Sequence, residues 1–257
     1  MPSNVGTLTP CLPPAPVLTS AGLALFLDLD GVLAPIASTP DAVVADPRRT
    51  RVLRALDRAL DGRLAIISGR TLPEIDRIAG GAARSAAGVH GLHRRRRDGS
   101  TVTTQPSPGV ATAVEAFRTF ADGHPGMIVE DKGVSAGLHY RGAPQAEAEA
   151  MALAEVWAER GGLVIQPGNL VVELKTPGAD KGTALTAFMA EPAFEGALPV
   201  MLGDDRPDEA GFRAAGMLGG YGILVGPPRE TSARYGLSDV EAVLTWLEGV
   251  AMEARPV

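Results

Sequence analysis

The sequence predicts an α/β protein in which a parallel sheet is interrupted by an inserted α+β domain. Short apolar runs at 23–27, 64–67, 199–202 and 222–226 alternate with amphipathic helical stretches, which is typical of strands buried on both faces. Between residues 105 and 176 the order changes to helix, strand, strand, helix, strand, strand. That order predicts a four-stranded antiparallel sheet backed by two helices.

Composition limits the class of protein. The chain has 257 residues, 45% of them hydrophobic, which is enough for a core with a smaller inserted domain. The net charge of −6 argues against a nucleic-acid partner. The single cysteine, Cys11, excludes an internal disulfide framework. No apolar run approaches the ~20 residues that span a bilayer, so no membrane partner is expected.

The expected domain order follows the changes in composition. Residues 1–20 are rich in Pro and Thr, lack the basic start and apolar stretch of a signal peptide, and are expected to form a disordered tail. The core is expected over 21–104 and again over 177–257, with the insertion at 105–176. We expect a cytoplasmic monomer.

Two acidic residues end the first apolar run. Asp28, Asp30 and Gly31 directly follow the buried strand at 23–27. Ligands of open α/β sheets bind at the carboxyl ends of strands. Two carboxylates placed there repel each other, so we predict a chemical role. The spacing lets Asp28 face a bound metal while Asp30 handles protons and offers its backbone carbonyl to that metal.

The end of the second strand has a composition that suits phosphate. A helix predicted over 48–60 leads to the strand at 64–67, which ends in Ser68, Gly69 and Arg70. A small hydroxyl beside a glycine and a helix N-terminus can bind phosphate. From the residues alone, a plain N-cap role for Ser68 is an equal alternative.

An arginine-rich hairpin is predicted after the third strand. The strand at 85–91 is followed by arginines at 94–97 and then by Asp98-Gly99, a hairpin signal. We expect the arginines to lie on a solvated edge ribbon that discourages aggregation. Steering of a substrate by one of them is the alternative, and His90 is read either as functional or as a hydrogen-bonded structural residue.

The insertion combines helices at 110–120 and 144–160 with strands at 127–132, 135–141, 163–166 and 169–175. Residues at i and i+2 share a face of a strand, so the polar residues of three strands gather on one face. A solvated sheet face is one interpretation. We favour a floor that binds sugar hydroxyls, because such groups need fixed donors and acceptors. The expected floor residues are Glu130, Lys132, Ser135, His139, Arg141, Glu173 and Lys175.

The returning core segment supplies a lysine and a second acidic cluster. Lys181 begins a helix, where a cation is unfavourable for the helix dipole, so a role in holding phosphate and the nucleophile is predicted. The strand at 199–202 ends in Gly203 and in the acids Asp204, Asp205 and Asp208. Oxygen ligands at a strand end predict Mg²⁺. A last strand at 222–226 and a helix at 238–249 close the chain.

These features, in this order, resemble the four motifs of the haloacid dehalogenase superfamily. The resemblance implies a Rossmann-like haloacid dehalogenase core with an inserted α+β cap of order αββαββ. It implies Asp28 as nucleophile, Asp30 as general acid/base, Ser68 and Lys181 as phosphate-binding groups, and Gly69 and Arg70 beside the substrate. It places Mg²⁺ on Asp28, the Asp30 carbonyl and Asp204, with Asp205 and Asp208 supporting.

The sequence of the insertion resembles one family within this superfamily. Glu130-x-Lys132-x-x-Ser135-x-x-x-His139-Tyr140-Arg141 and Val172-Glu173-x-Lys175 resemble trehalose-6-phosphate phosphatases, over roughly residues 21 to 250. This implies hydrolysis of trehalose 6-phosphate through an aspartyl-phosphate. His93 and Pro207 stand where that family often has Glu and Thr. The alternatives are a phosphatase for another phosphosugar such as sucrose phosphate, a phosphomutase, and a receiver-type module, which lacks a cap.

Overall fold

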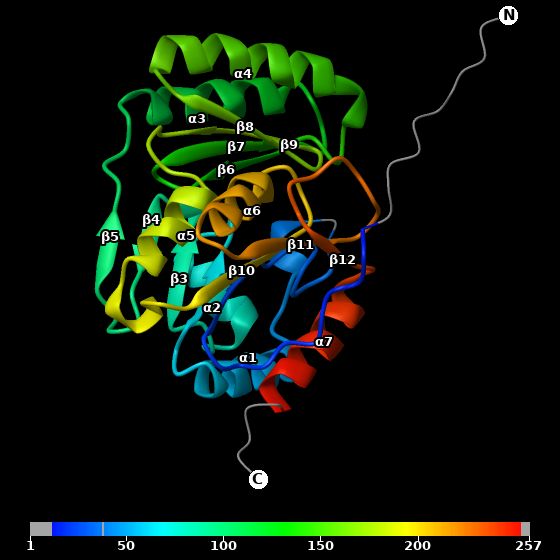
Figure 1. The fold of residues 1–257 in the computed structure, drawn as a ribbon. Coiled ribbons are helices and arrows are strands. Elements are labelled where there is room, and N and C mark those ends of the chain that lie inside the picture. Colours follow the sequence, from blue (N-terminus) through cyan, green and yellow to red (C-terminus); the bar gives the residue numbers. More distant parts are fainter. Residues whose placement is uncertain (1–11, 38, 253–257) are drawn as a thin grey trace, which may run out of the picture.

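The computed structural model describes residues 12–37 and 39–252 (Figure 1). Its main sheet has the strand order β12-β11-β10-β1-β2-β3-β4-β5. The strands from β12 to β3 pair in parallel, whereas β4 and β5 add an antiparallel hairpin at one edge. The strands are β1 Leu23–Leu27, β2 Leu64–Ile67, β3 Ser85–Gly88, β4 His93–Arg95, β5 Thr101–Thr103, β10 Leu198–Gly203, β11 Tyr221–Val225 and β12 Tyr235–Leu237.

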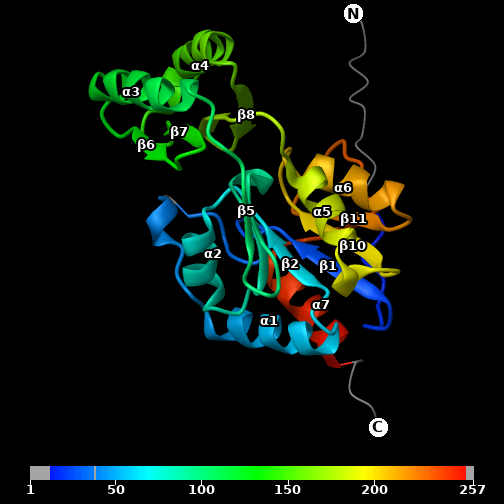
Figure 2. The same ribbon diagram turned by 90° about the vertical axis from the view of Figure 1, so that its left-hand side faces the viewer.

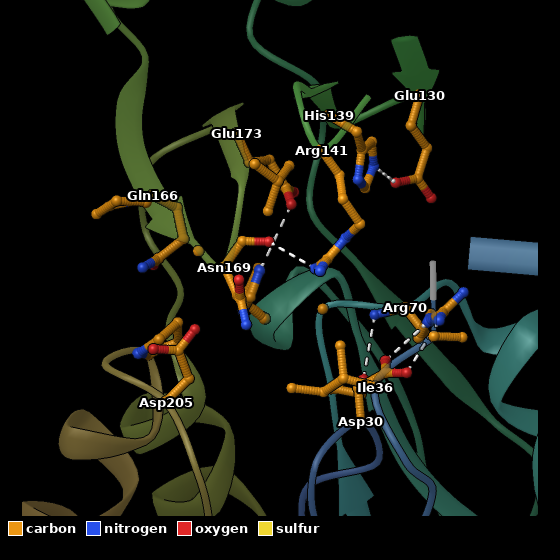
Figure 3. A pocket seen from close by; sticks show the side chains of 18 of the residues that line it. Asp30, Ile36, Arg70, Glu130, His139, Arg141, Gln166, Asn169, Glu173 and Asp205 are labelled. Carbon is orange, nitrogen blue, oxygen red and sulfur yellow. Dashed lines mark hydrogen bonds and ion pairs between the residues drawn. The ribbon is translucent and has the colours of Figure 1, made fainter. Parts of the chain in front are cut away.

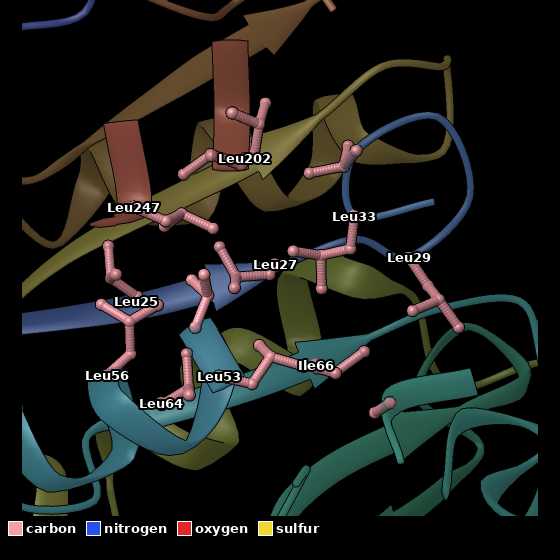
Figure 4. Packing of buried hydrophobic residues seen from close by; sticks show 14 of the residues in the cluster. Leu25, Leu27, Leu29, Leu33, Leu53, Leu56, Leu64, Ile66, Leu202 and Leu247 are labelled. Carbon is pink, nitrogen blue, oxygen red and sulfur yellow. The ribbon is translucent and has the colours of Figure 1, made fainter. Parts of the chain in front are cut away.

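Helices cover both faces of this sheet. One layer consists of α1 Pro47–Ala59, α2 Leu72–Ala79 and α7 Val240–Met252, and the other of α5 Lys181–Met189 and α6 Asp208–Met217. Strand β1 is fully buried, and its side chains alternate between the two layers. Leu25 and Leu27 pack with α1 and α7, as Figure 4 shows, while Phe26 packs with Phe188 of α5. The apolar run of β1 therefore forms the centre of the molecule.

A second sheet lies beyond the carboxyl ends of the core strands, as the side view in Figure 2 shows. We call the segment from α3 to β9 the cap. It contains α3 Gly109–Asp122, β6 Ile128–Asp131, β7 Ser135–His139, α4 Glu147–Gly161, β8 Val164–Gly168 and β9 Val171–Lys175. The sheet order is β6-β7-β9-β8, antiparallel throughout. Leu138, Val172 and Leu174 pack under the two helices, so the opposite face is free to meet the core.

The predicted fold class is confirmed. The structure has a mostly parallel α/β core and a cap of order αββαββ, with short 3₁₀ turns at Pro40–Ala42, Val89–Gly91, Pro144–Ala146 and Pro192–Phe194. Whether residues 105–176 behave as a separate domain stays a prediction. Within the described ranges, no helix combines the length and apolarity that crossing a bilayer requires.

The predicted tail is wrong for residues 12–20. Pro14 bridges to Gly236 of β12, and the Trp246 indole donates a hydrogen bond of 2.8 Å to the Pro16 carbonyl. This stretch lies along the open edge of β12, where backbone groups need partners. Cys11 lies outside the described residues.

The arginine hairpin is confirmed in position but not in its expected exposure. All four arginines are half-buried. Arg94 pairs with Glu191, Arg95 with Asp76 of α2 and Arg97 with Asp57 of α1. The strand β4 is flanked by β3 and β5, so it is not the sheet edge. The arginines therefore attach the hairpin to the helices rather than remain solvated.

Candidate active site

The turn after β1 places the first acid at the centre of the sheet edge. The Asp28 N–H donates to the Leu202 carbonyl of β10 at 3.0 Å, which continues the sheet by one residue. Gly31 then adopts a φ of +77°, and its N–H donates to the Ala34 carbonyl at 2.7 Å. A Cβ on Gly31 would lie 2.1 Å from Oδ2 of Asp204. Only glycine allows both this backbone turn and the close approach of the second acidic loop.

Lys181 joins the two acidic loops. Its Nζ lies 2.9 Å from Oδ2 of Asp28 and 2.6 Å from Oδ1 of Asp208, and all three side chains are buried. Asp180 caps helix α5 by accepting from the Thr183 N–H, which fixes Lys181 in the first turn. Burial alone would lower the pKa of Lys181, but Asp208 and Asp28 raise it. The ammonium is therefore held charged beside the predicted nucleophile.

Asp208 holds the loop that follows β10. Its Oδ2 accepts from the backbone N–H of Asp204 at 3.0 Å and of Asp205 at 3.1 Å, while Oδ1 receives Lys181. A Cβ on Gly203 would lie 2.3 Å from Cβ and Cγ of Asp208, so this residue too must be glycine. With both oxygens used, Asp208 supports the loop, and Asp204 and Asp205 face the cleft.

The acidic cluster fits a divalent cation. Asp28, Asp204 and Asp208 each offer an oxygen within 4.8 Å of one another. Burial raises the pKa of Asp28 well above its usual range. The Lys181 ammonium lowers this pKa, whereas the neighbouring Asp208 and Asp204 raise it. Burial and Asp208 also raise the pKa of Asp204 to about 7. Carboxylate oxygens gathered in this way are the type of ligand that Mg²⁺ prefers.

Ser68 and Arg70 lie at the end of β2. Ser68 is buried, and its Oγ accepts from the Arg70 N–H at 3.2 Å. The Arg70 guanidinium donates to both oxygens of Asp30, at 2.8 and 2.9 Å (Figure 3). It also donates to Glu74 of α2 at 3.1 Å. Thr71 and Glu74 form a capping box that starts α2. Arg70 thus orients the predicted acid/base, a role that the sequence did not suggest.

The cap contributes a polar floor, which we define as Glu130, Lys132, His139 and Glu173. Lys132 Nζ lies 2.9 Å from Glu173 and 3.5 Å from Glu130, and it donates to the Gly69 carbonyl of the core at 2.9 Å. His139 Nε2 lies 2.9 Å from Glu130. Burial alone would raise the pKa of Glu173, but Lys132 and His90 hold it well below its usual range. The floor is a charged network that contacts the loop at Ser68–Arg70, which is predicted to bind phosphate.

His90 forms a second link between core and cap. Its Nε2 lies 3.5 Å from Oε2 of Glu173, and its backbone N–H donates to the Ser68 carbonyl at 2.9 Å. Val89 and His90 both adopt positive φ, of 48° and 55°, a strained conformation for residues with a Cβ. Burial lowers the pKa of His90. The His-Gly pattern could have pointed to this residue, although the sequence left its role open.

One cleft of about 420 Å³ joins these groups between core and cap. It is lined by most of the predicted site residues, namely Asp28, Asp30, Ser68, Gly69, Arg70, Glu130, Lys132, His139, Arg141, Glu173, Lys181, Asp204 and Asp205. Asp208 supports it from behind. Figure 3 shows Glu130 and His139 on one side of the cleft and Gln166, Asn169 and Asp205 on the other.

Two predicted floor residues lie outside the lining of this cleft. The Ser135 side chain is fully buried. The Lys175 ammonium, also buried, donates to the Ala179 carbonyl at 2.8 Å. Both residues have the right strand parity, but Lys175 ends β9 where the chain turns back to the core, so its amine satisfies that connection instead. Neither supplies a group to the cleft.

Other lining residues were not assigned to the site from the sequence, which left the role of His90 open. The cleft includes Ile36, His90, Gln166 and Asn169. Gln166 belongs to β8 and Asn169 to the turn that follows it, and neither segment contains a charged pair. Of the two departures from the family pattern, Pro207 lines the cleft, whereas His93 lies in β4, outside the lining.

Comparisons with known proteins agree with this geometry. A family model described as trehalose-phosphatase matches residues 26–241. A protein named trehalose-6-phosphate phosphatase from Escherichia coli (strain K12) is 41% identical over 234 residues, covering 89% of this chain and 86% of the relative. A probable trehalose-phosphate phosphatase from Sinorhizobium fredii is 39% identical over 83% of this chain and 81% of that protein.

Solved structures resemble this one over nearly the whole chain. A trehalose-6-phosphate phosphatase related protein superposes with a TM-score of 0.76 at 25% identity, covering 89% of this chain and 97% of the other. The C-terminal domain of a Candida albicans trehalose-6-phosphate phosphatase reaches 0.80 at 21% identity, over 94% and 99%, and supports the fold. Because the family model spans most of its length and a bacterial relative is 41% identical, the chain belongs to the trehalose-phosphatase family of phosphoric monoester hydrolases.

Proposed function

We propose that this enzyme hydrolyses trehalose 6-phosphate to trehalose and phosphate, with Mg²⁺ as cofactor. The observation that carries the proposal is that one cleft combines Asp28, Lys181 and the acidic loop of the core with the polar floor of the cap. The core groups suit phosphate, and the floor suits a polyol. The names of the relatives support the same substrate.

In the proposed reaction, a carboxylate oxygen of Asp28 attacks phosphorus and forms an aspartyl-phosphate as the bond to the sugar oxygen breaks. Asp30 gives its proton to the leaving sugar oxygen. The Asp30 carboxylate then takes a proton from water, which attacks the same phosphorus, releases phosphate and regenerates Asp28. Lys181 and Ser68 hold phosphoryl oxygens. Phosphoryl transfer depends mainly on positioning and charge neutralisation, which these residues supply.

Asp30 needs to move for this role. Both of its oxygens are hydrogen-bonded to Arg70, and about a third of its side chain is exposed (32%). A bound phosphosugar offers Arg70 a competing anion, which would release Asp30 to protonate the leaving group. Arg70 would then orient the Asp30 carboxylate before substrate binds and contact the phosphosugar afterwards.

The cation would be held by Asp28, Asp204 and the Asp30 carbonyl, with Asp205 nearby and Asp208 behind. When bound, Mg²⁺ supplies positive charge that neutralises the phosphoryl oxygens during transfer. We expect a chelator to abolish turnover and added Mg²⁺ to restore it. Mg²⁺ should also raise the melting temperature, because it binds only the folded cluster. Full turnover in chelator would contradict the metal assignment.

The cap would close over the bound sugar and exclude water. Residues 105–176 are the segment proposed to move. In the closed state, Lys132 would contact the Gly69 carbonyl and Glu173 would contact His90. Closure of this kind keeps the reaction from bulk water until the leaving sugar is protonated.

A phosphate-release screen tests the proposed substrate. Trehalose 6-phosphate, sucrose 6-phosphate and glucose 6-phosphate should be compared at equal concentration, with Asp28→Asn as the inactive control. We expect trehalose 6-phosphate to be preferred by a wide margin. Faster release from sucrose 6-phosphate would instead support a phosphatase for another phosphosugar, and transfer of phosphate within a sugar without release would support a phosphomutase.

A further inference from the structure

The groups of the polar floor contact one another in the absence of substrate. Lys132 contacts Glu173, Glu130 and the Gly69 carbonyl, and His139 contacts Glu130. These contacts use the Lys132 ammonium and one oxygen each of Glu130 and Glu173, whereas Oε1 of Glu173 is buried without a hydrogen-bond partner among the described residues. Before a sugar arrives, the floor therefore keeps a free acceptor, but its ammonium donor is already in use. A site that distinguishes substrates by their hydroxyl groups also needs donors and acceptors that have no hydrogen-bond partner until the substrate binds.

Gln166 extends the same row of side chains across the cap sheet. Glu130 of β6 lies opposite Gly137 of β7, Gly137 lies opposite Glu173 of β9, and Glu173 lies opposite Gln166 of β8. Residues directly opposite one another in an antiparallel sheet project to the same face. Gln166 therefore faces the core, and it lines the cleft beside Asn169.

The Gln166 amide is unmatched. Among the residues that the structure describes, none forms a hydrogen bond with its side chain. Its cross-strand neighbour Glu173 contacts Lys132 and His90 instead. The side chain is half-buried at the cleft wall. A primary amide presents two donors and a carbonyl acceptor, which matches two neighbouring hydroxyls of a pyranose ring.

The segment that presents this amide is fixed in place. Pro167 follows Gln166 directly, and Leu170 adopts a φ of +58° in the turn. Arg141 donates to the Asn169 carbonyl at 3.0 Å, and the Tyr140 N–H donates to the Leu170 carbonyl at 3.0 Å. Figure 3 shows Arg141 reaching this turn, with Gln166 across the cleft from Glu130 and His139. These contacts hold the backbone that carries Gln166, so the entropy lost when the sugar arrives is mainly that of the Gln166 side chain.

We propose that Gln166 is a specificity-determining residue, whose amide binds hydroxyls of the sugar on the side of the cleft opposite Glu130 and His139. The inference rests on the proposed phosphosugar phosphatase activity and adds to it a second, uncharged wall for the disaccharide. Asn169, more exposed on the same turn, borders that wall, and Arg141 positions it.

The test replaces the amide by an apolar chain of the same length. Gln166→Met should lower kcat/KM for trehalose 6-phosphate about tenfold, the effect of removing one or two hydrogen bonds. It should leave kcat/KM for p-nitrophenyl phosphate unchanged, because that substrate has no sugar. Gln145→Met is the matched control, since Gln145 is exposed on the cap and outside the cleft lining.

The outcomes separate this inference from the proposed function. Absence of wild-type turnover on trehalose 6-phosphate overturns that substrate, and the same comparison is then made on the phosphosugar that is turned over. A Gln166→Met enzyme with wild-type kcat/KM on the phosphosugar overturns the inference. Equal losses on phosphosugar and p-nitrophenyl phosphate also overturn it, because Gln166 would then act on the fold or on the core site.

Discussion

At the residue scale, the site depends on one lysine shared between two buried acids. Lys181 contacts Asp28 and Asp208, and each of the three side chains is at most 8% exposed. A buried charge without a partner is strongly destabilising, so the three groups act as a unit. Asp208 completes the unit by holding the loop that presents Asp204. Charge placement and loop shape are therefore set by the same contacts.

The first prediction concerns the nucleophile. Asp28→Asn should abolish turnover, because a side-chain amide is too weak a nucleophile to form the aspartyl-phosphate. The melting temperature in metal-free buffer should change little, because Lys181 keeps its contact with Asp208 and because burial already raises the pKa of Asp28 and so disfavours its charge. Phosphate release and thermal unfolding measure the two effects. A stable Asp28→Asn protein that still turns over would show that another residue is the nucleophile.

The second prediction tests the close approach at Gly31. Gly31→Ala places a Cβ against the Asp204 carboxylate and requires alanine to adopt a φ of +77°. Because the Cβ would displace Asp204 from the acidic cluster, Mg²⁺ should no longer raise the melting temperature. Gly22 is the matched control, with a φ of +67° and no atom within 4 Å of the position that an added Cβ would take. Gly22→Ala should cost only the backbone strain, about 1–2 kcal/mol, and keep the Mg²⁺ response. Equal Mg²⁺ responses in the two variants would argue against the crowding explanation.

At the element scale, the cap sheet has two faces with different tasks. Leu138, Val172 and Leu174 pack under α3 and α4, while Lys132 and Glu173 project toward the core. Because alternate residues of a strand point to opposite faces, the same strands build a small hydrophobic core on one face and a polar lining of the cleft on the other. The core residues are proposed to bind phosphate, which all candidate substrates share, so on that proposal discrimination has to come from this surface.

The third prediction follows from that division. Glu173→Ala and Lys132→Ala should sharply lower kcat/KM for trehalose 6-phosphate, because sites built to hydrogen-bond hydroxyls discriminate by up to ~10⁴-fold. Slow hydrolysis of a small aryl phosphate should barely change. Comparing kcat/KM for both substrates in wild type and variants decides the point. Parallel losses on the two substrates would mean that these residues maintain the fold or the core site.

At the scale of the whole molecule, charged contacts join core and cap. Glu173 contacts His90 of the core, and Lys132 reaches the Gly69 carbonyl. Lys132 and His90 lower the pKa of Glu173 against the effect of burial, and burial lowers the pKa of His90. In both cases the folded state binds protons less readily than the unfolded chain, so acid favours unfolding.

The fourth prediction applies this linkage to Glu173. A carboxyl whose pKa is depressed in the folded state stabilises it above the unfolded pKa, near 4.5, and that contribution is lost as pH falls further toward the folded pKa. The melting temperature of the wild type should therefore exceed that of Glu173→Gln at pH 7, and the gap should narrow below about pH 4.5. Thermal unfolding from pH 7 to 3 measures it. A gap that widens in acid would contradict the assignment.

Most of the core site was predictable because its signals are local. An apolar run followed by Asp28, Asp30 and Gly31 already predicts a buried strand that ends in a charged turn, and Ser68, Lys181 and Asp204 likewise stand at element boundaries. Parallel strands bring their carboxyl ends to one edge, so these residues converge once the strands pair. The cap sheet was predictable for the same reason, since its strands alternate polar and apolar residues.

The chain by itself therefore determined the fold class, the order of the elements and the residues at the strand ends, because periodicity and turn composition act over a few neighbours. Only the tertiary structure decided which distant groups meet. Register and strand order brought Arg70 to Asp30, His90 to Glu173 and Gln166 into the cleft wall. The same geometry turned Lys175 toward Ala179 and the arginine hairpin toward the helices. Such partners lie far apart in sequence, so only the packed chain selects them.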